Sequence, residues 1–213
     1  MKLIVTRNSY KQRLNILANQ DAAFGLSPLK SVGQQDDSTA MTQYNILPGD
    51  ASLMFQSSLV IGAAAGYVDI AAAASVPNLG AFWGCFYDDP TTQKPTFRNA
   101  YPGGITPANG GAIEAFVYDS PHRMFEVQSN AAAGTMSQAD IFSTAAVATP
   151  TAGTTINGVS GMELDQGSIA QTVQQLKIIG KSRDPENSDY ATANVNFRVM
   201  INAHLLGSGR VGI

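Results

Sequence analysis

One cysteine and two histidines are the side chains in this sequence best suited to nucleophilic or metal chemistry. Cys85 beside His122 or His204 would form a thiol–imidazole pair, in which the imidazole takes the thiol proton. The residues next to Cys85 are mostly aromatic, however, and they favour a buried, unreactive thiol. A single cysteine also excludes an internal disulfide and a zinc site with two or more cysteines. We therefore expect a structural role for Cys85, and His204, near the end of the last predicted strand, is expected to be a structural or interface histidine.

Carboxylate pairs would provide a second kind of chemistry. Glu114 and Glu126 lie on two predicted neighbouring strands, and two carboxyl groups are the minimum for glycoside hydrolysis. Asp88, Asp89 and Asp119 carry the hard oxygen ligands that Ca²⁺ prefers. A solvent-facing polar stripe is a commoner reason for such glutamates, and turn aspartates usually accept hydrogen bonds from nearby backbone N–H groups. We assign no catalytic residue, no metal ligand and no cofactor to this sequence.

The sequence patterns of common nucleotide-binding and hydrolytic enzymes are missing. The chain has no Walker-type glycine-rich loop, no dinucleotide fingerprint after a strand and no Gly-x-Ser-x-Gly elbow. Only 14% of its 213 residues are charged, against about 25% in an average protein. Its net charge of −3 and its pI near 5.2 disfavour a nucleic-acid-binding protein, which usually carries a basic balance. These observations favour a protein that is not an enzyme.

The segments that would position these residues have the pattern of short strands between glycine, proline and aspartate turns. Predicted strands cover residues 79–87, 94–101, 113–118, 124–128, 175–180 and 194–202. Apolar and polar residues alternate along 113–118 and 124–128, and Asp119–His122 between them is a turn with a proline. This pattern predicts that the two segments pair as an antiparallel hairpin.

The apolar stretch 59–74 approaches the length of a membrane helix. Asp69 lies inside it, and a charge near the middle of a bilayer is costly. We therefore predict two short strands around a turn at 64–66, and a protein that does not enter a membrane. Short strands, frequent turns and no long amphipathic helix predict an all-β fold, an antiparallel β-sandwich or β-barrel with long loops.

An N-terminal arm, partly extended, is predicted over residues 1–50, followed by a β-rich domain over 51–213. The first thirty residues hold five cations and one acid, a net charge of +4, so the rest of the chain carries −7. This asymmetry fits a basic arm that lies on an acidic surface of its own chain or of a neighbour. A solvated N-terminus with chance basic residues is the alternative. We expect deletion of residues 1–45 to leave the β domain folded.

Several segments, taken in order, resemble the cement or decoration proteins of tailed-bacteriophage heads, which are encoded beside the major capsid protein. The resemblance spans roughly residues 50–205 and does not include the arm. The segments that carry it are Leu79–Tyr87, Ile113–Pro121, Met124–Gln128, Ser160–Asp165, Gln175–Gly180, Arg183–Asn187 and Val199–His204.

The resemblance implies a non-enzymatic viral structural protein that is made in the host cytoplasm and binds the outer surface of the virion capsid. Its partners would be the major capsid protein and itself, as homotrimers at three-fold and quasi-three-fold positions, with no nucleic acid, membrane or cofactor. A protein that binds only the assembled shell stabilises that shell by mass action. On this interpretation the arm contacts the capsid through Lys2, Arg7, Lys11 and Arg13.

Two other functions are compatible with the sequence. A β-sandwich that binds or hydrolyses carbohydrate would use Trp83, Tyr87, Tyr101 and Tyr118 to stack on sugar rings. A tail or fibre adaptor would share the small-residue composition, although fibres usually show heptads or internal repeats, and the sequence has neither.

Overall fold

The computed structural model describes residues 19–32, 41–74, 76–130, 137–190 and 192–207. The four arm residues assigned to capsid contact lie outside these ranges. Within them the chain forms thirteen strands and four short 3₁₀ helices. The strands are β1 (Ser27–Ser31), β2 (Thr42–Ile46), β3 (Leu59–Gly62), β4 (Val68–Ile70), β5 (Gly80–Asp88), β6 (Pro95–Arg98), β7 (Ile113–Tyr118), β8 (Arg123–Gln128), β9 (Thr144–Ala145), β10 (Val147–Ala148), β11 (Glu163–Leu164), β12 (Leu176–Lys181) and β13 (Asn196–Ile201). The 3₁₀ helices are η1 (Ala64–Gly66), η2 (Ala108–Gly110), η3 (Gln138–Asp140) and η4 (Gln166–Ser168).

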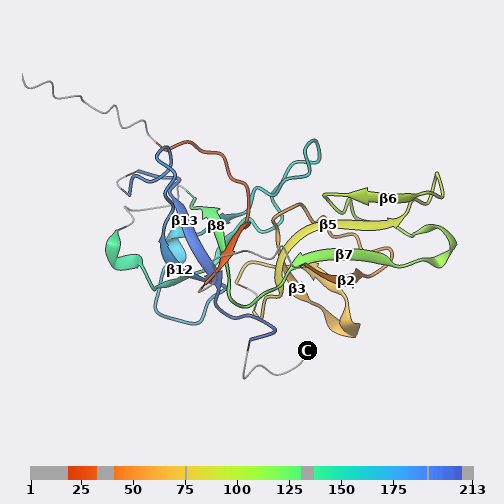
Figure 1. Ribbon diagram of the computed structural model, residues 1–213, viewed down its shortest axis with the longest axis horizontal. Helices are drawn as coiled ribbons and strands as arrows, with labels where there is room; N and C mark the ends of the chain where they lie inside the picture. The colour runs from red at the N-terminus through yellow and green to blue at the C-terminus, as the bar shows by residue number, and fades with distance from the viewer. Residues whose placement is uncertain (1–18, 33–40, 75, 131–136, 191, 208–213) are drawn as a thin grey trace, which may run out of the picture.

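These strands form antiparallel sheets, so the all-β fold predicted from the sequence, a sandwich or a barrel, is confirmed, and the arrangement is consistent with a sandwich. In the described part of the chain, a five-stranded sheet has the order β1-β8-β13-β12-β9. A six-stranded sheet has the order β2-β7-β5-β3-β4, with β6 paired to β5, and β10 pairs with β11. A bridge between Asn45 and Tyr67 brings the two ends of the six-stranded sheet together, so this sheet curls toward a barrel. Figure 1 shows β8, β12 and β13 in one half of the molecule and β2, β5, β6 and β7 extending from it in the other.

Two hydrophobic clusters fill the two halves. The first lies under the five-stranded sheet, where alternate residues of β13 such as Phe197 and Val199 point inward, as their period of two predicts. Ala81 and Tyr118, at one end of the six-stranded sheet, also belong to this cluster. The second cluster fills the curled six-stranded sheet and includes the fully buried Phe82. The two sheets therefore share a core at one end of the six-stranded sheet, where Ala81, Tyr118 and Leu59 of β3 lie.

The hairpin predicted from the alternating segments is wrong, although both of its strands exist. β7 pairs with β2 and β5, whereas β8 pairs with β1 and β13 in the other sheet. The residues between them carry the chain from one sheet to the other. Tyr118 is buried in the shared core, and the Asp119 carboxylate accepts a 2.6 Å hydrogen bond from the Tyr44 hydroxyl. These contacts hold the end of β7 in its own sheet, because a return hairpin would leave the Asp119 carboxylate without this partner.

The predicted boundary at residue 50 does not separate an arm from the β domain. β1 pairs with β8, and β2 pairs with β7 along its whole length. Leu26, just before β1, is fully buried in the first cluster. The Gln128 side chain anchors the segment before Leu26, since its Nε2 donates to the carbonyl of Gln20 at 2.8 Å. Residues 19–32 and 41–50 are thus part of the folded unit.

The apolar stretch 59–74 forms strands, as predicted. β3 and β4 pair around η1, whose Ala65 has a φ of +65°. In the described part of the chain, no helix is long and apolar enough to cross a membrane. The predicted strands at 79–87 and 94–101 also exist, as β5 and its partner β6.

Candidate functional site

The two glutamates weighed as a hydrolytic pair lie on different sheets. Glu114 is on β7, opposite Phe86 of β5, and Glu126 is on β8, opposite Arg198 of β13. Their proposed proximity depended on the hairpin, so it fails with the hairpin. The structure does not assemble a paired-carboxylate site from them.

The three aspartates weighed as Ca²⁺ ligands are also apart. Asp88 is at one end of β5, whereas Tyr118, which precedes Asp119, pairs with Ala81 at the other end. The Asp89 carboxylate accepts hydrogen bonds from the backbone N–H groups of Thr91 and Thr92, each 2.9 Å long. No group of three or more His, Cys, Asp or Glu side chains in the described ranges is placed to hold a metal ion.

The thiol and the imidazole are structural, as the sequence predicted. Cys85 is fully buried in the second cluster, and burial raises the pKa of its thiol to about 12. His204 is also buried, and its Nδ1 accepts a 3.1 Å hydrogen bond from the N–H of Leu206. Burial lowers the pKa of His204 to about 4, so the ring is neutral at pH 7.

The four aromatic residues proposed to stack on sugars do not form a platform. Tyr87 and Tyr101 are buried in the second cluster, and Tyr118 is buried in the first. The half-buried Trp83 packs edge-to-face on Tyr118, with ring centroids 5.7 Å apart. Tyr87, Tyr101 and Tyr118 are core residues and Trp83 packs against the first cluster, so the four rings do not face solvent together. The expectation of a sugar platform from this quartet is wrong.

One surface does gather side chains suited to binding, on the outer face of β5, β6 and β7. The pairing of β5 with β7 shifts register at Trp83, which is the extra residue of a β-bulge. On one side of the bulge the outer face carries Tyr118 and is covered by the first cluster. On the other side it carries Phe86 and Phe116, and there the five-stranded sheet no longer covers it. One sheet face is therefore core at one end and surface at the other.

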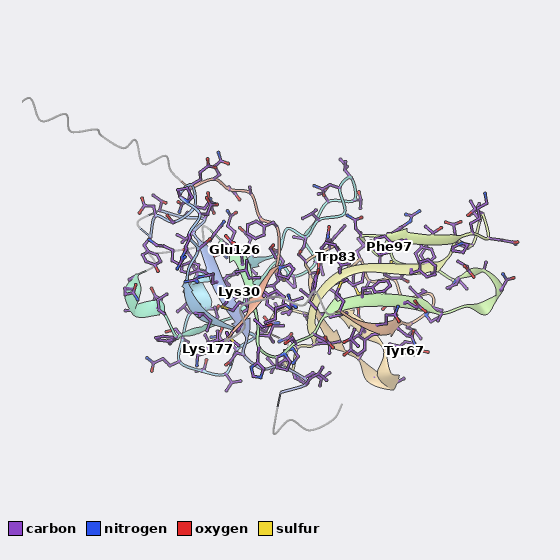
Figure 2. All side chains as sticks on the ribbon, in the orientation of Figure 1. Lys30, Tyr67, Trp83, Phe97, Glu126 and Lys177 are labelled. Atoms are coloured by element: carbon purple, nitrogen blue, oxygen red, sulfur yellow. The ribbon has the colours of Figure 1, made fainter. Side chains whose placement is uncertain are left out.

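We call this surface, made of the exposed Phe86 and Phe97 and the half-buried Phe116, the aromatic face. Phe97 of β6 pairs with Phe86 of β5, and residues directly opposite across two strands share a face. Phe86 is 38% exposed and Phe97 is 53% exposed. The rings of Phe97 and Phe116 are tilted against each other, with centroids 6.1 Å apart. Figure 2 shows Phe97 on the extended half of the molecule, away from Lys30, Glu126 and Lys177.

Acidic side chains border the aromatic face. Asp88 is two residues beyond Phe86 on β5, and Glu114 is directly opposite Phe86 on β7. The strand alternation places no lysine or arginine on this face among the described residues of β2, β5, β6 and β7, since Arg98 follows Phe97 and points to the other side. The face is thus apolar at its centre and negative on the side of Asp88 and Glu114, whereas the exposed Arg98 lines the adjoining groove.

An open groove lies next to the aromatic face. Its volume is about 560 Å³, and it lies between the residues around Phe97 and the turn that carries Ile156. The Ile156 side chain is almost fully exposed at the tip of this turn. The Asn99 side chain fixes the turn by donating a 2.7 Å hydrogen bond to the carbonyl of Asn157. Leu53 also lines the groove, so exposed apolar surface continues from the aromatic face across it.

The other half of the molecule carries a groove of opposite charge. Its volume is about 450 Å³, and Lys30, Arg183 and Arg198 line it together with Glu126. We call this the basic groove. The two halves therefore present different surfaces, apolar and acidic on the aromatic face and basic on the five-stranded sheet.

Sequence reasoning missed the aromatic face. The predicted strands 79–87 and 113–118 include Phe86 and Phe116, but the sequence pattern did not separate the covered face of these strands from the exposed one. A signal did exist, because Phe86 and Phe116 both alternate with residues that are buried in the second cluster, Cys85 and Ala115. Alternation alone leaves open which of two faces is covered when both carry apolar residues.

No protein-family model, curated protein or solved structure matches the chain. The resemblance to phage head proteins therefore rests on the sequence segments alone.

Proposed function

We propose that this chain is a non-enzymatic structural protein of a tailed-bacteriophage head, a cement or decoration protein on the outer surface of the shell. The aromatic face carries the proposal. Contiguous exposed apolar surface bordered by polar groups is typical of protein–protein contact sites, whereas single exposed apolar residues are ordinary. Phe86, Phe97 and Phe116 form such a group on a rigid sheet rather than on a loop.

The proposed role needs a surface that other chains can cover. The aromatic face is a candidate because it is apolar and exposed. It continues a sheet face whose other end is already packed in a core through Trp83 and Tyr118. A neighbouring chain on the shell would extend that packing and remove the exposed rings from water. Removal of this apolar surface from water favours association, and the loss of translational and rotational freedom opposes it. Binding that occurs only on the assembled shell then stabilises the shell.

The test mixes the purified protein with heads assembled without it and sediments the particles. We expect the protein to sediment with the heads and to increase the fraction of heads that survive heating. Heads already carrying the protein serve as the saturated control. Protein that stays in the supernatant while the heads sediment contradicts the proposal. So does an unchanged fraction of heads that survive heating. Binding to purified tails in place of heads would favour the tail-adaptor alternative.

A further inference from the structure

The aromatic face needs an occupant, and the chain itself contains a segment with complementary chemistry. The N-terminal segment, residues 1–18, lies outside the described residues. It has no aspartate or glutamate, and its cations are Lys2, Arg7, Lys11 and Arg13. The run Leu3-Ile4-Val5 lies between the first two of these cations. An apolar run flanked by cations complements a surface that is apolar at its centre and acidic at its edge.

We propose that the N-terminal segment of a second copy of this chain binds across the aromatic face. Leu3, Ile4 and Val5 would cover Phe86 and Phe97, and the flanking cations would lie near Asp88 and Glu114. β6 also offers a free strand edge beside this surface, because within the described ranges it pairs only with β5. A segment rich in β-branched and aliphatic residues suits addition to such an edge.

The basic groove is a poor docking site for this segment because both carry positive charge. The basic groove places Lys30, Arg183 and Arg198 around a single carboxylate, that of Glu126. A segment with four cations and no acid is repelled there and attracted to the aromatic face. This attraction is between exposed groups, so salt weakens it.

The first described residue lies in the half of the molecule away from the aromatic face, and the test below distinguishes a second copy from the same chain as the owner of the bound segment. Asn19, the first described residue, donates hydrogen bonds from its side chain to the carbonyls of Asp189 and Ala193. These residues belong to the half that carries β13, whereas Phe97 lies on the extended half (Figures 1 and 2). Eighteen extended residues span up to about 60 Å, which suffices to reach a neighbour. This inference concerns contacts between copies and does not depend on binding to a head.

The test is complementation between two full-length variants in sedimentation velocity experiments. The face variant carries Phe86→Ser and Phe97→Ser, and the segment variant carries Leu3→Ser, Ile4→Ser and Val5→Ser. We expect the wild-type chain to self-associate, and each variant alone to do so at least about tenfold more weakly, since aromatic anchors dominate interfaces. Mixing the two variants restores one segment–face contact and therefore yields a complex of two chains.

The matched control is Phe142→Ser, which removes an aromatic ring that is 71% exposed and lies outside the aromatic face. We expect this control to associate like the wild type, and raised salt to weaken association of both. Thermal unfolding of each variant identifies any that fail to fold. If the variant mixture stays monomeric while the wild type associates, the segment does not act between copies. A wild type that is monomeric at every concentration, or a face variant that associates like the wild type, also overturns the proposal.

Discussion

The ring of Phe97 lies over the backbone of Gly84, so closely that a Cβ atom on Gly84 would be 2.7 Å from Phe97 Cζ. Gly84 is the residue after the bulge at Trp83, on the outer face of β5. The missing side chain leaves room for the Phe97 ring over Gly84, beside Phe116. The aromatic face thus depends on a glycine as much as on its phenylalanines.

The first prediction follows from this contact. Gly84→Ala places a Cβ atom 2.7 Å from both the Phe97 ring and the carbonyl oxygen of Arg98, so the backbone of β6 must shift. We expect a loss of about 1–3 kcal/mol in the free energy of unfolding, as for other overpacked sites. Chemical denaturation measures it. Gly111→Ala is the control, since its Cβ would have no neighbour nearer than 3.5 Å. Equal stability of the two variants contradicts this account.

The second prediction concerns Cys85. Because the thiol is fully buried and its pKa is raised to about 12, very little thiolate forms at pH 8. We expect iodoacetamide to leave the folded protein unmodified and to alkylate it completely in guanidinium chloride, with mass spectrometry as the readout. Rapid alkylation of the folded chain would show that Cys85 is accessible, and it would support a reactive thiol paired with a histidine.

The third prediction is a loss of stability in acid caused by His204. The pKa of this residue falls from 6.5 in the unfolded chain to about 4 in the folded protein, chiefly through burial. The unfolded state therefore binds a proton more readily, and stability that is fully present above pH 6.5 decreases as the pH falls toward 4. The slope approaches at most about 1.4 kcal/mol per pH unit. The nearby Asp119 and His122 act in opposite directions, Asp119 favouring and His122 disfavouring the protonated ring.

His204→Asn separates this effect from general acid unfolding. The asparagine amide oxygen occupies nearly the position of Nδ1 and still accepts the N–H of Leu206, but it does not titrate. We expect its unfolding free energy to fall less steeply than that of the wild type between pH 6.5 and pH 4. Parallel pH profiles for the two proteins would mean that His204 is not responsible.

The fourth prediction replaces the expectation that residues 1–45 are dispensable. Deletion of residues 1–18 leaves every described strand and the buried Leu26 in place, so we expect the melting temperature to be nearly unchanged at concentrations where the chain is monomeric. Deletion of residues 1–45 removes β1, most of β2 and the buried Leu26. Burial of a leucine side chain contributes about 1.5–3 kcal/mol, and this loss alone lowers the melting temperature by several degrees. Equal melting temperatures for the two truncated proteins would instead support the boundary predicted at residue 50 between an arm and the β domain.

Local chemistry explains where sequence reasoning succeeded. The strand at 196–201 is predictable because Phe197 and Val199 repeat at a period of two and bury one face. The turn at 64–66 is predictable because Gly66 tolerates a positive φ angle, whereas Ala65 adopts its φ of +65° at a steric cost. The inert Cys85 is predictable from its aromatic neighbours. Each of these features depends on residues within a few positions along the chain.

Pairing between distant segments explains where sequence reasoning failed. A four-residue turn after an alternating strand fits both a hairpin and a crossing between sheets, and contacts of Tyr118 and Asp119 with distant residues select the crossing. The sugar platform failed for the same reason, because burial of Tyr87 and Tyr101 depends on strands far away in the chain.

The sequence by itself determined the all-β class, most strand positions, the buried thiol and the segregation of charge, because these follow from residue type and local period. Only the tertiary structure decided that β7 and β8 belong to different sheets, that residues 27–31 and 42–46 are part of the fold, and that Phe86, Phe97 and Phe116 form one exposed face. The physical reason is that a strand buries whichever face its neighbours cover, and strand alternation does not specify those neighbours.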